Sequence, residues 1–516
     1  MAKDGVPCRA SQGCALIVRE CYVTESDNHQ QPDRESLARA VIARYTAIVD
    51  DPQALLGALL RPIPVTLWAN PLRLNRDSLL ELLRADGFRA DAMDWSAAGI
   101  RLSPDARPGR HWGFLAGLFQ VQEEVSMLPV MLLDPRPGER VLDLCAAPGN
   151  KTAQMALAMN NLGTVIANDL RKGRLAAMRQ TIKRLGLLNV AITARDGQSL
   201  GGEIGGFDRV LVDAPCSCEG TFRKVANPTV STERFRMSRA ATQARLLEKA
   251  VRLTRPGGRI VYSTCTLAPE ENEAVVDTVL HRYPGTLRVV PMSVPGLKAA
   301  SGITAWQQRV FDPSLSQTLR LWPHHNDTGG FFVAVLERTD AADPPPEGKR
   351  FRPSNEAVDA LAPLTDRFGI DSEAFSGAGA VAWSNKHVCL APRDHDYPAS
   401  PMPDSLGLPA VRRRSLPVKP TTAAALLYGD QAVRNLVPLD TDQLRVYLDR
   451  EPIHHPREDQ LAACTGPGHV LLRYQGYTVG LGQLIFDRAT GVPRIASLMP
   501  KAWSRDAVSL GPAEEG

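Results

Sequence analysis

Two cysteines stand at positions where they could do covalent chemistry. Cys216 lies in DAPCSCEGTFRK and Cys265 lies in YSTCTLAPEEN, and each motif follows a short apolar run. A thiolate that adds to carbon 6 of a pyrimidine makes carbon 5 nucleophilic enough to attack a methyl donor. A second reactive group nearby would help to remove the proton from carbon 5, so that the thiolate can leave. Such a pair could serve this chemistry if a methyl donor binds nearby, and the spacing alone leaves open which cysteine is the nucleophile.

The loop CAAPGNK (145–151) is the best candidate for cofactor binding. It contains neither the G-x-G-x-x-G of a pyrophosphate turn nor the G-x-x-x-x-G-K-[ST] of a triphosphate cradle, so a nucleoside without phosphates fits it better. Asp169 ends the next apolar run, where a carboxylate can accept both ribose hydroxyls. Asp196 could flank an adenine, and Asp213 ends the fourth run. Together these residues suggest S-adenosylmethionine as the cofactor.

An alternation of apolar runs and helical segments from residue 138 to residue 338 must position these groups. Buried strands read as such runs, and helices between them imply right-handed crossovers into a parallel sheet. We therefore expect an α/β fold of the class I methyltransferase type, with a doubly wound, mostly parallel sheet. The segment GGFFVAVLE (329–337) is expected to be its last strand. The predicted first five strands are RVLDLC (140–145), GTVIAND (163–169), VAITA (190–194), DRVLVDA (208–214) and GRIVYST (258–264).

Length and composition predict several domains in an ordinary globular protein. The 516 residues exceed the roughly 250 to 300 at which one core stops growing. With 44% hydrophobic and 22% charged residues, the chain is not collagen-like, largely disordered or supercharged. We expect a loosely ordered extension (1–32), a small α+β N-terminal lobe (33–110), the methyltransferase domain (111–339), a Pro-rich linker (340–379) and a β-rich C-terminal region (380–516).

Charge and cysteine usage constrain the location and the partners. A net charge of +4 is too small to establish a polyanionic partner. Nine cysteines at irregular spacing suit reduced thiols better than a disulfide framework. No apolar run is long enough for a membrane helix, and the N-terminus is too polar for a secretion signal, so we expect a cytoplasmic protein without membrane contact.

Several motifs in combination resemble one enzyme family. They are FQVQEEVSMLP (119–129), LDLCAAPGNKT (142–152), ANDL (167–170), DAPCSCEG (213–220) and YSTCT followed by PEENE (262–273). The set is similar to the Sun (Fmu) family of RNA cytosine-5 methyltransferases, and in particular to its RsmF-like bacterial members. More weakly, RSLPVKPTTAAALL (414–427) and YTVGLGQLIF (477–486) resemble the partly PUA-like C-terminal RNA-binding region of those members.

The resemblance implies a reaction and roles for single residues. The reaction is methyl transfer from S-adenosylmethionine to carbon 5 of a cytosine in RNA, with rRNA favoured over tRNA. The family assigns the nucleophile to the cysteine of the TC motif, here Cys265, and the release of product to the PC cysteine, here Cys216. Asp213 would contact the target base and support protonation of its ring nitrogen, and Lys151 would lie in the active centre. Implied cofactor contacts are Cys145, Ala146, Ala147, Pro148, Gly149, Asn150, Lys151, Asp169, Asp196 and Asp213.

Two residues depart from the family pattern. Asn150 replaces the second Gly of the commoner APGGK and leaves the loop small. Cys218 replaces the usual Gly after PCS and creates a CxC pair that could ligate metal or form a strained disulfide. Four soft ligands at zinc-finger spacing are absent, so we expect no metal. The same holds for the N-terminal group of Cys8, Cys14, Cys21 and His29.

An RNA substrate requires an unpaired or flipped base and contacts to phosphates. Candidates for phosphate contacts are the basic clusters GKRFR (348–352) and VRRRSLPVKP (411–420). For the basic helix RKGRLAAMRQTIKRLG (171–186) we favour a solvated outer face, and for Trp306, Phe331 and Phe332 we favour core packing over base stacking. We expect RNA as the partner and a monomer in solution.

Three other functions are open on the sequence. An amino-directed nucleic-acid methyltransferase usually has an aromatic residue after an (N/D)PP motif, which DAPCS lacks. A non-catalytic RNA-binding ribosome assembly factor could retain the fold, although the intact Cys216, Cys265 and Asp213 argue against lost activity. A small-molecule methyltransferase is disfavoured by the additional domains.

Overall fold

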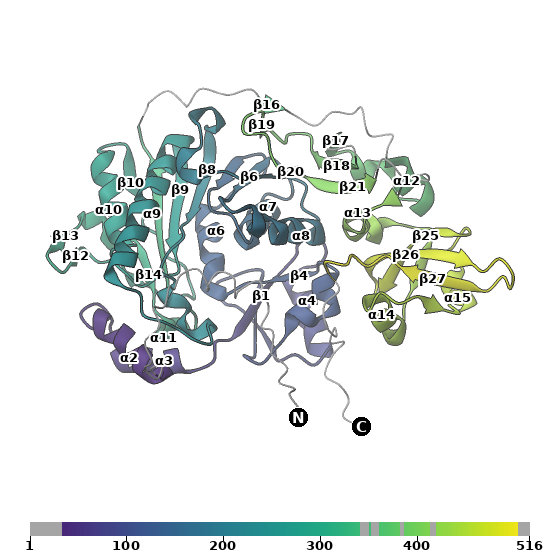
Figure 1. Ribbon diagram of the computed structural model, residues 1–516, viewed down its shortest axis with the longest axis horizontal. Helices are drawn as coiled ribbons and strands as arrows, with labels where there is room; N and C mark the ends of the chain where they lie inside the picture. The colour runs from purple at the N-terminus through teal and green to yellow at the C-terminus, as the bar shows by residue number, and fades with distance from the viewer. Residues whose placement is uncertain (1–32, 341–349, 352–360, 382–385, 413–418, 504–516) are drawn as a thin grey trace, which may run out of the picture.

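A ten-stranded mixed sheet forms the centre of the molecule (Figure 1). The computed structural model describes residues 33–340, 350–351, 361–381, 386–412 and 419–503. The sheet order is β11-β14-β15-β9-β8-β5-β6-β7-β20, with β10 paired to β15. The strands are β5 (Arg140–Asp143), β6 (Thr164–Asn168), β7 (Val190–Thr193), β8 (Phe207–Asp213), β9 (Thr254–Thr264), β10 (Leu287–Val289), β11 (Ala300–Ser301), β14 (Leu319–Leu321), β15 (Phe331–Arg338) and β20 (Ser405–Leu406).

The predicted doubly wound class I methyltransferase fold is confirmed. Strands β5 to β9 pair in parallel, and β15 closes this part of the sheet antiparallel to β9. Alternate residues of each strand enter two separate cores, as Val141 and Leu142 of β5 illustrate. One face is covered by α6 (Leu128–Leu133), α7 (Asn150–Ala158) and α8 (Leu175–Leu185), and the other by α9 (Glu233–Leu253) and α10 (Glu273–Arg282). Burial on both faces explains the continuous apolar runs in the sequence.

The order of the parallel strands places a topological switch between β5 and β8. From β5 the chain builds outward through β6 and β7, and it then returns to the other side of β5 as β8 and β9. Ligands of open α/β sheets bind outside the carboxyl ends of the strands at such a point. The loops that follow β5, β8 and β9 carry the motifs singled out in the sequence, so the fold brings them to one edge.

The N-terminal segment divides into two parts that pack in different places (Figure 1). Helices α2 (Arg34–Tyr45) and α3 (Pro52–Leu60) pack against Phe222 and Leu267, one in each of the two cysteine motifs. The second part is a four-stranded sheet with helices. It consists of β1 (Val65–Ala69), β2 (Ala90–Ala92), β3 (Gly99–Leu102), β4 (Phe119–Val121), α4 (Arg76–Ala85) and α5 (Trp112–Leu115).

The C-terminal region contains two further sheets. Strands β17 (Ala378–Val381), β18 (His387–Pro392), β21 (Leu408–Arg412) and β22 (Lys419–Pro420) form one. The other consists of β23 (Leu436–Pro438), β24 (Ile453–His454), β25 (Gly468–Tyr474), β26 (Tyr477–Phe486) and β27 (Pro493–Ser497). The short pairs β12 (Ala305–Trp306) with β13 (Arg309–Val310) and β16 (Arg350–Phe351) with β19 (Tyr397–Pro398) complete the strands. The helices here are α12 (Ala362–Phe368), α13 (Thr422–Tyr428), α14 (Thr441–Leu448) and α15 (Glu458–Leu461), and α11 (Pro323–Asn326) precedes β15.

The domain boundaries stay predictions, and packing crosses them in two places. Strand β20, from the C-terminal region, pairs with β7 and forms an edge of the catalytic sheet. The sheet β1–β4 shares one hydrophobic core with β23–β27, to which Ile100 and Leu472 both contribute. Among the residues that the structure describes, no helix combines the length and apolarity needed to span a bilayer.

Candidate active site

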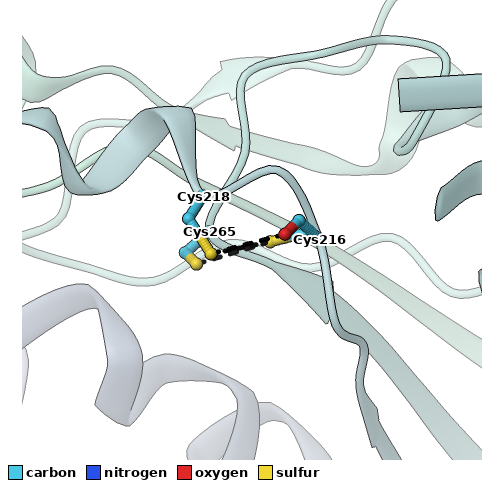
Figure 2. Close-up of side chains that lie close together, drawn as sticks. All are labelled: Cys216, Cys218 and Cys265. Carbon is cyan, nitrogen blue, oxygen red and sulfur yellow. Dashed lines mark hydrogen bonds between the residues drawn. The ribbon is translucent and has the colours of Figure 1, made fainter. Parts of the chain in front are cut away.

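The loops after β8 and β9 bring three cysteines together (Figure 2). The Sγ atoms of Cys216 and Cys265 are 3.4 Å apart, and Cys218 Sγ lies 3.9 Å from Cys216 Sγ. The Cys216 side chain is buried at 5% exposure, whereas Cys265 and Cys218 are partly exposed. Cys265 also packs against the core that includes Ala146 and Ala147 of the β5 loop. The two predicted thiols therefore share one edge of the sheet with the predicted cofactor loop.

Two consecutive side chains, Glu271 and Asn272, hold the cysteine loops in place. Glu271 Oε2 accepts a hydrogen bond of 2.9 Å from the backbone N–H of Ser217. Asn272 accepts one of 2.5 Å from Thr264 Oγ1 and donates one of 3.1 Å to the carbonyl of Thr266, on either side of Cys265. All of these partners are buried. The PEENE motif is part of the family resemblance, but no role for Glu271 or Asn272 was predicted from it.

The thiols of Cys216 and Cys265 differ in acidity. The pKa of Cys265 lies well below the ordinary value, because the Cys216 and Cys218 thiols hydrogen-bond to it and because Lys224 and Lys151 add positive potential. For Cys216, the hydrogen bond with Cys218 lowers the pKa, but the bond to Cys265 and burial outweigh it and raise the pKa well above the ordinary value. Of the two cysteines, Cys265 is therefore the one whose surroundings favour the thiolate. A thiolate is the nucleophilic form of cysteine.

Lys151 and Asp213 form an ion pair beside the thiols. Lys151 Nζ donates to Asp213 Oδ2 at 2.8 Å and to Ser126 Oγ at 2.9 Å. The other carboxylate oxygen of Asp213 accepts from Ser263 Oγ at 2.8 Å. The Asp213 side chain is 31% exposed and that of Lys151 is 11% exposed, so the pair faces the open side of the edge. It offers a proton donor and an acceptor to a polar ring.

The loop after β5 ends at Gly149, the residue before α7, and Asp169 binds its backbone. Gly149 has φ +106°, and a Cβ there would lie 2.6 Å from Met178 Cγ, so only glycine starts α7 without strain. Asp169 Oδ2 accepts from the N–H of Ala147 and Oδ1 accepts from the N–H of Arg171, both at 3.0 Å. Asp196 lies beyond β7 and accepts from the N–H of Gln198 at 3.0 Å.

These residues fit a cationic nucleoside better than a phosphorylated cofactor. Asp169, Asp196 and Asp213 place three carboxylates along one edge, where they can accept hydroxyl protons; Lys151 pairs with Asp213 and Arg174 with Asp169. Leu170, 63% exposed directly after Asp169, adds an apolar surface that the sequence analysis did not single out. An exposed leucine beside an acceptor matches a ribose joined to an aromatic base.

Asp143, inside β5, is a second residue that the sequence analysis did not single out. Its Oδ2 accepts from Thr152 Oγ1 at 2.7 Å, and its Oδ1 finds no hydrogen-bond partner among the described residues. Burial raises the pKa of Asp143 to about 7, and this outweighs the hydrogen bond from Thr152, which lowers it. The signal in the sequence was an acid within the apolar run RVLDLC.

The structure decides several of the predicted nucleic-acid contacts. Phe331 and Phe332 are buried in the sheet, which confirms core packing. Trp306 is half-buried and stacks on Tyr45. Arg184 of the basic helix is 5% exposed and donates hydrogen bonds to the carbonyls of Phe114 and Phe119. The prediction that this residue lies on a solvated face is therefore wrong, and Arg184 does not contact RNA. Some of the predicted residues lie outside the described part of the chain. They are Cys8, Cys14, Cys21 and His29 of the N-terminal group, residues 348, 349 and 352 of GKRFR, and residues 413–418.

The known proteins that this chain resembles are methyltransferases. A family model described as 16S rRNA methyltransferase RsmB/F matches residues 130–337. A ribosomal RNA small subunit methyltransferase F of Klebsiella pneumoniae is 36% identical over 343 residues, which is 64% of this chain and 69% of the relative. A tRNA (cytosine(49)-C(5))-methyltransferase of Pyrococcus abyssi is 34% identical over 59% of this chain and 97% of the relative. The structure of a methyltransferase homolog protein from Pyrococcus horikoshii superposes with a TM-score of 0.52 at 31% identity, covering 59% of this chain and 96% of that one.

Proposed function

Because the chain belongs to the RsmB/F family of 16S rRNA methyltransferases, we propose that it transfers a methyl group from S-adenosylmethionine to carbon 5 of a cytosine in RNA. The observation that carries the proposal is the 3.4 Å separation of the Cys216 and Cys265 sulfurs beside the β5 loop. We propose rRNA as the RNA, since the family model is described by it, and tRNA is the competing class because the Pyrococcus abyssi relative is named for it. The C-terminal region from residue 380 is the proposed RNA-binding part, with PUA-like character.

The cofactor site lies along the carboxyl edge of the parallel strands. S-adenosylmethionine supplies a methyl group on a sulfonium that a carbon nucleophile can attack. Asp169 would accept the ribose hydroxyls, Asp196 and Leu170 would lie beside the adenine, and the loop 145–151 would wrap the remainder. The carboxylates at this edge would favour the positive sulfonium over the neutral product.

Cys265 starts the reaction as the nucleophile. The pKa of its thiol is lowered and its side chain is partly exposed, so its thiolate form can add to carbon 6 of the cytosine. Negative charge then develops on the ring, where the Lys151–Asp213 pair can donate a proton toward the ring nitrogen. Carbon 5 becomes the nucleophile that takes the methyl group.

Cys216 completes the reaction as the base. The thiolate of Cys265 is one reason why the pKa of Cys216 is high. Once the Cys265 sulfur is bonded to carbon 6, that negative charge is gone, and the pKa of Cys216 falls. Cys216 then loses its proton to solvent and accepts the proton of carbon 5, while the carbon–sulfur bond breaks and restores the Cys265 thiolate. The ring nitrogen returns its proton to the Lys151–Asp213 pair as the carbon–sulfur bond breaks, so that the pair and both cysteines end in their starting forms and one proton has been released.

The proposal is tested by methyl transfer to RNA from cells that lack the gene, with bisulfite mapping of the modified cytosine. Cys265→Ala is expected to abolish transfer, and Cys216→Ala is expected to accumulate a covalent enzyme–RNA adduct on denaturing gels. Cys21→Ser, outside every motif assigned to the site and outside the proposed RNA-binding region, is the matched control and should retain transfer. Full transfer by Cys265→Ala together with loss of transfer in Cys216→Ala would reverse the two roles. RNA binding without any methyl incorporation would favour the non-catalytic assembly factor.

A further inference from the structure

Of the three clustered thiols, Cys218 is the one that the proposed methyl transfer leaves unused. It follows Cys216 by two residues, and its Sγ donates a hydrogen bond of 3.4 Å to the carbonyl of Cys216. Cys218 adopts φ +60°, a left-handed conformation that favours glycine. In this conformation the sulfur of Cys218 points toward the sulfurs of Cys216 and Cys265 (Figure 2).

We propose that Cys216, Cys218 and Cys265 together form a binding site for a soft metal ion, with Zn²⁺ as the physiological candidate. The three sulfur atoms all lie within 4.8 Å of one another. Zinc–sulfur bonds of about 2.3 Å at tetrahedral angles require sulfur atoms roughly 3.8 Å apart. The observed separations of 3.4 and 3.9 Å bracket that value, so the metal can enter with small side-chain movements.

The surroundings supply what a three-thiolate site needs. Thiolates are the ligands that Zn²⁺ and Cu⁺ prefer. Three thiolates and one Zn²⁺ carry a net charge of −1, and both Lys151 and Lys224 exert positive potential on Cys265. Each lysine is also paired with a carboxylate, Asp213 or Glu123, which reduces this effect. Because Cys218 and Cys265 are partly exposed, a fourth position is open to water.

Binding replaces protons by metal and involves no oxidation. Each cysteine binds as a thiolate, and the protons that the three thiols carry pass to the buffer. The sulfur electron pairs that held those protons then form the bonds to zinc. The linear spacing of cysteines predicted no metal site, because the third ligand comes from a different strand and the sequence does not show its distance.

A metal at this position would regulate the site. Zinc would occupy the Cys265 electron pair that is needed for addition to carbon 6, so it would inhibit methyl transfer reversibly. This consequence rests on the proposed function, whereas metal binding itself does not. The two are therefore measured separately.

Metal binding is measured on the full chain in which Cys8, Cys14 and Cys21 are replaced by serine, under reducing conditions. Cd²⁺ serves as the spectroscopic probe through thiolate-to-metal absorption, and Zn²⁺ stoichiometry follows from equilibrium dialysis. We expect one ion per chain that depends on Cys218 and gives thiolate-to-metal absorption; the other group of possible ligands, Asp50, His324 and His325, contains no thiolate and would not give this absorption. Cys218→Gly suits the left-handed backbone and should fold; it is expected to weaken binding by roughly tenfold or more. Cys464→Ser, the matched control, should bind as the parent does.

The results separate the inference from the proposed function. No stoichiometric ion, or equal affinity in the parent and in Cys218→Gly, overturns the metal site. If Cd²⁺ binds as expected but no RNA is ever methylated, the proposed function fails and the metal site stands. If both hold, Zn²⁺ should inhibit the parent at concentrations at which Cys218→Gly, compared with its own metal-free rate, is little affected.

Discussion

The hydroxyls of Ser217 and Thr266 lie 2.7 Å apart in a buried hydrogen bond, and each belongs to the residue that follows one of the paired cysteines. The two residues are 49 positions apart in the chain. Their hydrogen bond ties the loop after β8 to the loop after β9. The spacing of the Cys216 and Cys265 sulfurs is thus set by a hydroxyl pair as well as by the neighbouring strands.

Replacing Thr266 by valine should disturb the thiol pair. The substitution keeps the shape and removes the hydroxyl, which leaves the buried Ser217 hydroxyl without that partner at a cost of about 1–3 kcal/mol in the free energy of unfolding. We expect kcat for methyl transfer to fall more than the KM for RNA rises, because loop geometry changes and RNA contacts do not. Thermal melting and steady-state kinetics measure the two effects. An unchanged kcat would show that the hydroxyl pair does not control the sulfur spacing.

The acidity of Cys265 predicts selective alkylation near neutral pH. Because its pKa is lowered, a larger fraction of Cys265 is thiolate near pH 7 than of ordinary cysteines, whose pKa of about 8.5 keeps them mostly protonated. Iodoacetamide at pH 7 should label Cys265 first, as mass spectrometry of peptides would show. Cys389 is the internal comparison, since burial raises its pKa to about 12. Labelling of Cys216 ahead of Cys265 would contradict the assignment of the thiolate.

Glu271 should make the protein less stable as the pH rises toward neutrality. Burial raises its pKa to about 7 and outweighs the hydrogen bonds from Ser217 and Gln243, which lower it. The folded state therefore holds a proton that the unfolded chain loses near its ordinary pKa of about 4.3, so stability from this group decreases between about pH 4.5 and 7, by on the order of 3 kcal/mol. Glu271→Gln should melt with a weaker pH dependence in that window. Parallel pH profiles for the variant and the parent would exclude Glu271 as the source.

The conformation of Gly149 predicts a strong effect of a single methyl group. Gly149→Ala places a side chain at φ +106° and against Met178, which costs about 1–3 kcal/mol at a position that must also wrap the cofactor. We expect weaker binding of S-adenosylmethionine in calorimetry. Asn150→Gly, the neighbouring change toward the commoner APGGK, is the control and should bind almost normally despite losing a hydrogen bond from Gln120. Equal affinity in Gly149→Ala and the parent would show that the loop tolerates a side chain there.

The sequence alone determined the catalytic fold and the edge at which its chemistry lies. Apolar runs alternating with helical segments predicted the parallel strands, because strands buried on both faces must be apolar throughout. Since the carboxyl ends of parallel strands lie at the same edge, Cys216, Cys265 and the loop 145–151 could be assigned to one site before any distance was known. The buried aromatic residues of β15 followed from the same pattern.

Only the tertiary structure decided how the groups at that edge meet. Arg184 has the charge of a surface residue, yet packing turns it inward to carbonyls contributed by another part of the chain. Glu271 and Asn272 stand in a motif visible in the sequence, but the loops that they hold are brought to them by the sheet. Whether Cys218 joins the other two sulfurs likewise depends on a turn and on a neighbouring strand. Local periodicity fixes which face a residue takes within its own element, whereas contacts between distant loops depend on the packing of many side chains at once.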